Sequence, residues 1–245
     1  MKRVITLTLA LSLLLAGSAM AQGRWGQNTT PADSGSNQNG YCSQTIADMA
    51  LEDVSANEKE DLLYMREEEK LARDLYQSFY EKWGTRIFDN IAKSEQKHTD
   101  SIKALLTKYA ITDPVINDAT GIFINTDLQQ IYNDLLTSGS ISFLDALKVG
   151  AAVEELDISD LEKAIAEADS QDIKTVYENL MKGSRNHLRS YVRLLEAYGQ
   201  EYQAVYLTSE EVAAIIDSPM ERGLYDKNGN PMFQSICSLK PIVFQ

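Results

Sequence analysis

Histidine, cysteine and positive charge are all scarce in this sequence. Two histidines and two cysteines occur in 245 residues, and 36 acidic side chains outnumber 23 basic ones, for a formal net charge of −13. Nucleic acids and anionic membranes bind positively charged surfaces, so this acidity argues against both as partners. Beyond residue 21 no apolar run is long enough to cross a bilayer as a helix. We therefore expect a protein with no nucleic-acid partner and no membrane span.

The N-terminal segment, residues 1–21, has the composition of a secretory signal. Lys2 and Arg3 precede an apolar run from Val4 to Gly17, and Ala19-Met20-Ala21 fits a small-residue cleavage site. We expect cleavage after Ala21 and a periplasmic or secreted protein. Because the two basic residues leave with the signal, the formal net charge then changes from −13 to −15.

The two cysteines, Cys42 and Cys237, lie near opposite ends of the mature chain. In an oxidising compartment the simplest interpretation is one disulfide that ties the two tails together. The alternative, that both are metal ligands, lacks a neighbouring cysteine or histidine at ligand spacing. We predict the disulfide.

Composition divides the rest of the mature chain into three parts. Residues 22–54 are poor in aliphatic side chains and rich in small polar ones, which predicts a disordered leader or linker. Residues 55–207 have a helical apolar pattern and enough apolar side chains for one core. Residues 208–245 contain the turn-forming run 226–231, so we expect an irregular extension that packs on the helical domain and has room for one hairpin.

Apolar side chains at intervals of three and four predict four long helices in the central part. Ser55 is a good N-cap for the first, and Gly84, Pro114 and Gly199 mark helix ends or stops. The predicted helices span residues 56–83, 86–109, 143–166 and 172–198.

The connections between these helices predict how they are arranged. The first and last connections are short, so each joins an antiparallel pair. The middle one, residues 110–141, is long and contains a predicted minor helix at 126–137. Two hairpins joined by one long crossover have the connectivity of ferritin-like bundles. The predicted fold is therefore an all-α, antiparallel four-helix bundle with a short accessory helix and an irregular C-terminal tail.

Each predicted helix has a metal-ligating side chain near its midpoint, within its apolar stripe. These residues are Glu69 in the first helix, Glu95 and His98 in the second, Glu154 in the third and His187 in the fourth. In an antiparallel bundle the helix midpoints lie at one level, so we expect these five side chains to converge in one layer of the core.

Charge and ligand chemistry favour a dimetal site there. Ionised side chains in an apolar core cost several kcal/mol each unless they are paired or bound to metal. Three glutamates offset most of the charge of two divalent ions, and the spacing Glu95-x-x-His98 puts both groups on one helix face. Carboxylate and imidazole ligands without thiolate suit iron or manganese.

Two simpler interpretations remain open. A buried glutamate or histidine is more often a paired core residue than a ligand, so the five residues could form a metal-free polar network. Glutamate-rich segments such as residues 66–70 mostly form solvated helix faces. Against this, the only two histidines both fall on core stripes, at equivalent levels of the two hairpins.

The same motifs resemble those of known proteins. The run from Glu69 to Phe79 is similar to the first ligand helix of rubrerythrins, and the run from Ile91 to His98 to their second. The stretch 62–207 resembles a family of ferritin-like proteins of unknown function, through EEEKLARDLY, SEQKH, VGAAVEELDI and GSRNHLRSY. This resemblance implies a carboxylate-bridged di-iron site with Glu69, Glu95, His98, Glu154 and His187 as ligands.

One position departs from the ferritin-like pattern. Such proteins usually have a second Glu-x-x-His on the fourth helix, where this chain has Ser184-x-x-His187. Asp157, one turn beyond Glu154, could supply the missing oxygen; otherwise the site holds one metal, an asymmetric pair or none. Glu155 and Glu162 lie on the other side of the third helix and are expected to face solvent.

The expected function is that of an exported di-iron protein acting on ferrous iron, dioxygen or peroxide, with an external electron donor. In that hypothesis Glu95 and Glu154 bridge the metals, while Glu69 and the two histidines are terminal ligands. Tyr76 and Tyr191 lie one to two turns from ligands and serve either as hydrogen-bond donors and electron relays or simply as core residues. The rival is a non-catalytic binding or structural module of the cell envelope.

Overall fold

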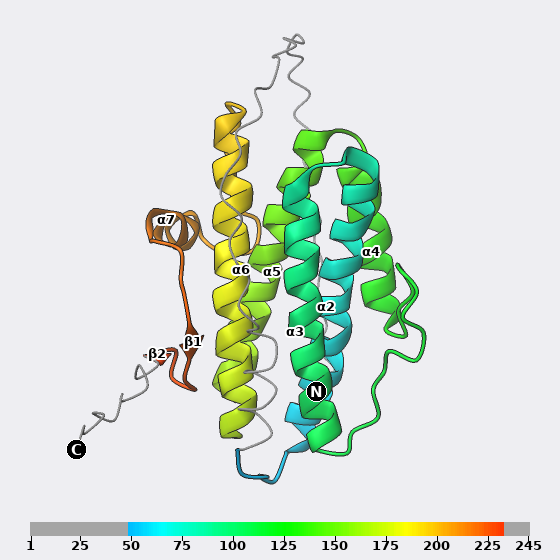
Figure 1. The fold of residues 1–245 in the computed structure, drawn as a ribbon, viewed down its shortest axis with the longest axis vertical. Coiled ribbons are helices and arrows are strands. Elements are labelled where there is room, and N and C mark those ends of the chain that lie inside the picture. Colours follow the sequence, from blue (N-terminus) through cyan, green and yellow to red (C-terminus); the bar gives the residue numbers. More distant parts are fainter. Residues whose placement is uncertain (1–48, 233–245) are drawn as a thin grey trace, which may run out of the picture. The chain divides into compact units, whose positions relative to one another are not determined.

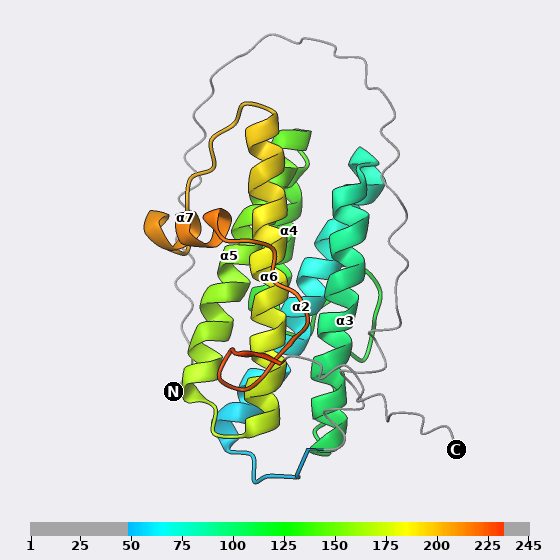
Figure 2. The ribbon, with the colours of Figure 1, turned by 60° about the vertical axis from the view of Figure 1, so that its left-hand side comes forward.

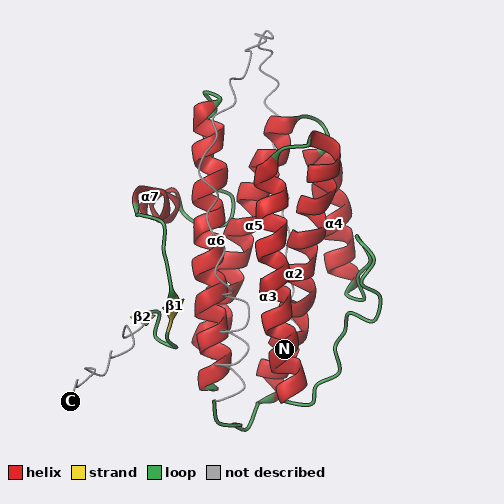
Figure 3. Ribbon diagram, viewed as in Figure 1, coloured by secondary structure: helices red, strands yellow, loops and turns green. Residues whose placement is uncertain are grey.

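The computed structural model describes residues 49–232, and these residues are mainly helical (Figure 3). The expected signal segment, most of the expected leader and both cysteines, Cys42 and Cys237, lie outside the described residues. The predicted all-α class is confirmed. None of the helices in residues 49–232 is both long and apolar enough to cross a membrane.

The described part of the chain contains four long helices and two shorter ones (Figure 1). The bounds of the five predicted helices differ by at most two residues from those predicted from apolar spacing. The helices are α2 (Ala56–Trp83), α3 (Arg86–Lys108), α4 (Thr126–Gly139), α5 (Phe143–Glu167), α6 (Gln171–Ala197) and α7 (Ser209–Asp217).

The long helices pack in two antiparallel pairs. Helix α2 lies along α3 and α5 lies along α6, while α2 also contacts α5 and α3 contacts α6 (Figures 1 and 2). Residues 109–125 and α4 connect the pairs, and α4 packs against both α2 and α5. The long connection therefore runs beside α2, and the helix midpoints of both pairs lie at a similar level (Figure 1).

Local signals set the ends of the first helix. The Ser55 hydroxyl accepts from the Glu58 N–H at 3.2 Å, and the Glu58 carboxylate accepts from the Ser55 N–H at 2.8 Å, which is a capping box. At the other end Gly84 has a φ of 64°, a left-handed conformation that favours glycine. Both ends were predicted from these residues.

The charged stretch 66–70 of α2 is buried, contrary to the interpretation that it forms a solvated face. Three of its side chains hold the 109–125 loop. Arg66 pairs with Asp113 at 3.1 Å, Glu67 accepts from the N–H groups of residues 124 and 125, and Lys70 donates to the carbonyls of residues 119 and 122. These contacts fasten the loop to α2 and satisfy backbone groups that would otherwise lack partners.

Glu155 on α5 is fully buried, so its predicted exposure to solvent is wrong; Glu162 is exposed as predicted. The Glu155 carboxylate accepts hydrogen bonds from three consecutive N–H groups, of Val205, Tyr206 and Leu207, at 2.9–3.0 Å. It therefore anchors the segment after α6 to α5. Helical periodicity placed this residue away from the core but could not show that another segment covers it.

The C-terminal part is more regular than predicted, because it contains α7 as well as a hairpin. Thr208 and Glu211 form a capping box at the start of α7, a signal already present in the sequence. Strands β1 (Leu224–Tyr225) and β2 (Pro231–Met232) pair antiparallel and form a hairpin, which the turn-forming run 226–231 had indicated as an option.

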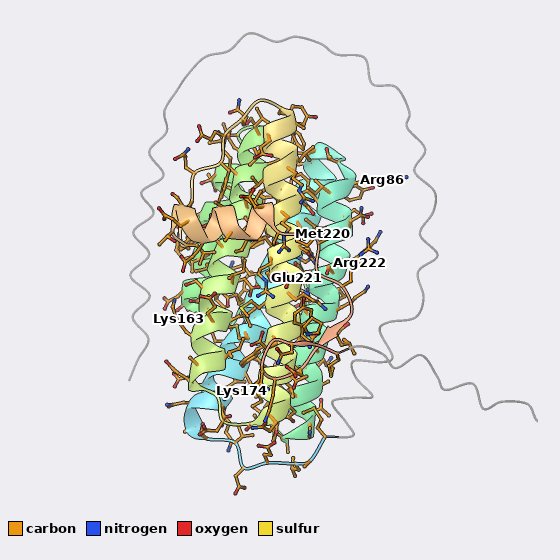
Figure 4. The ribbon with its side chains drawn as sticks, turned by 90° about the vertical axis from the view of Figure 1, so that its left-hand side faces the viewer. Arg86, Lys163, Lys174, Met220, Glu221 and Arg222 are labelled. Atoms are coloured by element: carbon orange, nitrogen blue, oxygen red, sulfur yellow. The ribbon has the colours of Figure 1, made fainter. Side chains whose placement is uncertain are left out.

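The segment between α7 and the hairpin lies along α6 (Figure 4). There Glu221 pairs with Arg185 at 2.6 Å and Arg189 at 3.0 Å. These ion pairs join the extension to the outer face of the last long helix.

The Glu58 carboxylate links the start of α2 to the turn between α5 and α6. Besides the Ser55 N–H, its carboxylate accepts from the N–H groups of Asp169 and Ser170, which join α5 to α6. Burial alone would raise the pKa of Glu58, but the hydrogen bonds from Ser170 and Ser55 lower it to about 2.

We expect Glu58→Ala to lower the free energy of unfolding by about 2–3 kcal/mol at pH 7. Because the folded-state pKa is depressed, the carboxylate stabilises the fold above the ordinary value of 4.5 and loses this effect as the pH falls towards 2. Urea unfolding at several pH values measures the difference, with exposed Glu60→Ala as control. A difference that does not shrink in acid would contradict this account.

Candidate metal centre

The structure brings the five predicted metal-ligating side chains together. Glu69 comes from α2, Glu95 and His98 from α3, Glu154 from α5 and His187 from α6, and each is at most 8% exposed. Within residues 49–232, they form two groups whose ligand atoms lie within 4.8 Å of one another. One group is Glu69, Glu95 and His98, and the other is Glu95, Glu154 and His187. Glu95 belongs to both.

The two groups have matching geometry about Glu95. One of its oxygens, Oε2, lies 2.7 Å from His98 Nδ1, and the other, Oε1, lies 2.7 Å from His187 Nδ1. Beyond the imidazoles, Glu69 Oε2 is 3.2 Å from His98 Nδ1, and Glu154 Oε2 is 3.3 Å from His187 Nδ1. The two rings stack with centroids 5.6 Å apart. Each half thus has one imidazole, one carboxylate of its own and one oxygen of the shared carboxylate.

Burial and mutual contact shift the pKa values of these groups in opposite directions. Burial disfavours the charged form of Glu95, but the facing imidazoles of His98 and His187 hold its pKa well below the usual range. Burial likewise opposes charge on the histidines, but Glu95 and its neighbours raise the pKa of His187 to about 10 and that of His98 well above its ordinary value. Burial raises the pKa of Glu69 to about 8, although His98 opposes this.

The donor set is of a kind that divalent metals bind. The Oε1 atom of Glu69 is buried with no hydrogen-bond partner, so the carboxylate is incompletely satisfied by protein groups. Each half offers imidazole nitrogen and carboxylate oxygen, and neither contains a sulfur ligand. That combination binds divalent ions such as iron, manganese or zinc. These buried carboxylate and histidine groups could therefore hold metal ions.

Asp157 and Ser184 lie beside the two groups without belonging to either. The single proton of the Ser184 hydroxyl has two acceptors within reach, Asp157 Oδ2 and the Leu180 carbonyl, and Asp157 Oδ1 has no hydrogen-bond partner. Asp157 thus reaches the position on α6 where the ferritin-like pattern has a glutamate. It remains the candidate for the oxygen that Ser184 does not supply.

Tyr76 and Tyr191 are fully buried next to Glu154. The Tyr76 hydroxyl donates to Glu154 Oε1 at 2.6 Å, and the two tyrosine rings pack with centroids 5.5 Å apart. Tyr76 therefore orients one of the site carboxylates as a hydrogen-bond donor, whereas Tyr191 packs against the Tyr76 ring. The core-filling and donor interpretations both hold for Tyr76.

Gly183 is a residue of the site that sequence reasoning missed. A Cβ atom at this position would lie 2.5 Å from His98 Nε2 and 2.6 Å from His98 Cε1. The missing side chain therefore gives the His98 ring its place between α3 and α6. A lone glycine in the middle of a strongly amphipathic helix was the available signal.

We expect Gly183→Ala to displace the His98 imidazole. The clash should lower the free energy of unfolding by about 1–3 kcal/mol, as overpacking of a core does. It should also weaken metal binding, because Nδ1 moves away from Glu69 and Glu95. Urea unfolding, together with the imidazole signals in NMR spectra, measures both effects. Unchanged His98 signals in a folded variant would contradict the proposed role of Gly183.

Metal binding should release protons and strengthen as the pH rises. Near pH 7 the raised pKa values keep both imidazoles, and Glu69 with its pKa of about 8, protonated in the metal-free protein. A metal must displace these protons, so its apparent affinity should rise between about pH 6 and 9. Calorimetric titration in two buffers of different ionisation enthalpy counts the protons released. We expect at least two per chain, and an affinity independent of pH would refute this prediction.

Comparisons with known proteins place the chain in a family. A family model described as "Uncharacterized protein domain (DUF2202)" matches residues 58–219, which include every residue of the two groups. "Uncharacterized protein MJ0754" of Methanocaldococcus jannaschii is 54% identical over 179 residues, which cover 73% of this chain and 97% of that protein. A crystal structure of hypothetical protein MJ0754 from Methanococcus jannaschii is similar, with a TM-score of 0.70 over 71% of this chain and 99% of that chain, at 54% identity. The chain therefore belongs to the DUF2202 family.

Proposed function

We propose that this protein is an exported, ferritin-like four-helix bundle that binds two metal ions and acts in iron or oxygen redox chemistry. The observation that carries the proposal is the position of Glu95, whose two oxygens each face a different imidazole at 2.7 Å. A carboxylate shared in this way between two nitrogen ligands is what a bridged metal pair requires. A polar network without metal has no need for two such equivalent halves.

The arrangement of the helices supports the ferritin-like part of the proposal. Two antiparallel pairs are joined by a long connection that carries α4, and ligand-type side chains from all four long helices face one another. Carboxylate-bridged metal pairs in ferritin-like bundles are built in this way, with glutamates and Glu-x-x-His motifs that project inward.

Each residue then has a defined role. Glu95 would be shared by the two ions, Glu69 and His98 would hold one of them, and Glu154 and His187 would hold the other. This differs from the expectation that Glu154 also bridges, because Glu154 belongs only to the group with His187. Two ferrous ions held here would supply two electrons to dioxygen or peroxide.

The surrounding residues prepare the site for that chemistry. Tyr76 holds the Glu154 carboxylate through a hydrogen bond of 2.6 Å, and the low exposure of all five residues restricts water. The two imidazoles present Nδ1 to the carboxylates that would bind the same ions. Regeneration of the reduced state requires an external electron donor, and the signal-like N-terminus supports a periplasmic or secreted location.

The rival proposal, a non-catalytic envelope module, rests on Ser184. Its hydroxyl takes the place of a carboxylate, so the site has one charge fewer than the ferritin-like pattern. Iron and manganese also share the ligands found here. Metal counting and reactivity separate these possibilities.

We expect the mature protein, loaded with ferrous iron without oxygen, to hold two iron ions per chain. His98→Ala and His187→Ala should each lose iron, because each removes the one imidazole of its half. Lys97→Ala, an exposed neighbour on α3, is the matched control and should retain both ions. Metal analysis after desalting gives the count.

Exposure of the loaded protein to dioxygen or peroxide then tests reactivity. A rapid optical change that is absent from both histidine variants would support redox chemistry. Bound iron with no optical change would favour the inert module. Wild-type protein that binds no metal under any loading condition would refute the dimetal site.

A further inference from the structure

The two imidazoles are the least buried part of the candidate metal centre. The side chains of His98 and His187 are 10% and 11% exposed, whereas those of Glu69, Glu95 and Glu154 are 1–2% exposed. The α2–α5 side of the bundle is covered by α4, which packs against both helices. Because the imidazoles come from α3 and α6, the centre lies nearest to solvent along the line where these two helices meet, here called the α3–α6 seam (Figure 2).

Basic side chains line the α3 side of this seam. Arg86, Lys93 and Lys97 are exposed, and helical spacing puts them within about 40° of one another around the helix axis. Lys108 lies on the same flank, and its ammonium is 2.7 Å from Asp172 of α6, so this flank faces α6. The α3 side of the seam is therefore positively charged.

The α6 side of the seam is also basic. Gly183 lies against the His98 ring, and helical spacing places exposed Arg193 just outside Gly183 on α6. The segment after α7 crosses α6 towards α3 and brings exposed Arg222 to this side of the molecule (Figures 2 and 4). Positive side chains from three segments thus border the seam.

These charges lie close to the imidazoles. Lys97 directly precedes His98 in the sequence. Lys93 lies about 7.5 Å along α3 from His98, and Arg193 lies about 9 Å along α6 from His187, by helix rise. Because α3 and α6 run antiparallel, Lys93 and Arg193 lie at a similar level, on the same side of the imidazole layer (Figure 1).

Acidic charge is concentrated on other parts of the surface, although the chain has a net charge of −13. Near the seam, Asp89 is paired with Lys93 at 2.7 Å, and Glu221 is paired with Arg185 and Arg189. Helices α4 and α7 have only acidic charges, namely Asp127, Asp134, Glu210, Glu211 and Asp217. The seam is therefore a basic patch on an acidic protein, and it lies over the imidazoles of the candidate centre.

We propose that the α3–α6 seam is the docking surface for an acidic redox protein that serves as the external electron donor. This inference rests on the proposed function, which requires such a donor. A basic patch steers an acidic surface towards it and fixes its orientation. A donor seated there has its shortest path to the centre through His98 and His187. Two one-electron donors would each lose one electron at this surface, which balances the two electrons that dioxygen or peroxide removes.

An anionic membrane fits the patch less well. A membrane would also meet the acidic remainder of the surface, which it repels. It also gives no reason for the basic side chains to lie over the imidazoles. The charge distribution and the position of the centre together favour the acidic protein.

Binding of an acidic plant-type [2Fe–2S] ferredoxin to the metal-free protein tests docking without any turnover. Calorimetric titration should give a Kd that rises between about 0.02 M and about 0.2 M salt, because salt screens the charges. At low salt, Lys97→Glu combined with Arg193→Glu should raise the Kd at least about tenfold. Lys59→Glu combined with Lys148→Glu, on α2 and α5, changes the net charge equally and should raise the Kd less than about twofold.

Both double variants should keep the wild-type circular dichroism spectrum, because the changed side chains lie at the surface. An equal Kd for the two double variants would overturn the proposal. So would a wild-type protein that binds no ferredoxin at low salt. Binding to phosphatidylglycerol vesicles in place of the ferredoxin would assign the patch to a membrane and would also overturn it.

Iron-loaded protein separates this proposal from the dimetal proposal. If both hold, reduced ferredoxin should reduce the oxidised protein more slowly in the Lys97→Glu, Arg193→Glu variant, with an unchanged iron count. The small neutral reductant hydroquinone should reduce both proteins at the same rate. If iron is bound but ferredoxin binding does not depend on the seam, only the docking proposal fails. If ferredoxin binds at the seam but no metal is bound under any loading condition, the dimetal centre fails and electron donation is refuted with it.

Discussion

The contact of one carboxylate with two imidazoles is the interaction on which the centre of this protein depends. Glu95 on α3 faces His98 on its own helix and His187 on α6, and so joins the two helical pairs across their interface. Buried charge of this kind is tolerated only when each group is compensated. The partners must therefore converge in one layer, which constrains the level at which all four long helices meet.

The α2 segment 66–70 shows how a helix distributes charge. Successive residues on a helix point about 100° apart, so five adjacent charged side chains face different surroundings. Arg66, Glu67 and Lys70 hold the 109–125 loop, Glu69 enters the Glu/His layer and Glu68 lines a small cavity between α2, α4 and α5. The crossover and the site are thus fixed by one helix, and a shift of α2 would disturb both.

Much of the fold could be predicted because its signals are local. The four long helices follow from apolar spacing, and their ends follow from Ser55, Gly84 and similar residues. The five convergent residues were predicted because antiparallel helices bring their midpoints to one level. Helix α7 was not predicted, although its capping box is an equally local signal. The composition of residues 208–245 indicated an irregular segment instead.

Residues whose roles depend on distant segments could not be predicted in the same way. By itself the sequence determined the helices, their connections and the level of each Glu or His, because these depend on residues a few positions apart. The tertiary structure alone decided that Glu155 is covered by residues 205–207, that Gly183 makes room for His98, and that Glu68 and Asp157 line one cavity. Each of these depends on which chain segment packs over a helix face, and periodicity within one helix carries no information about that.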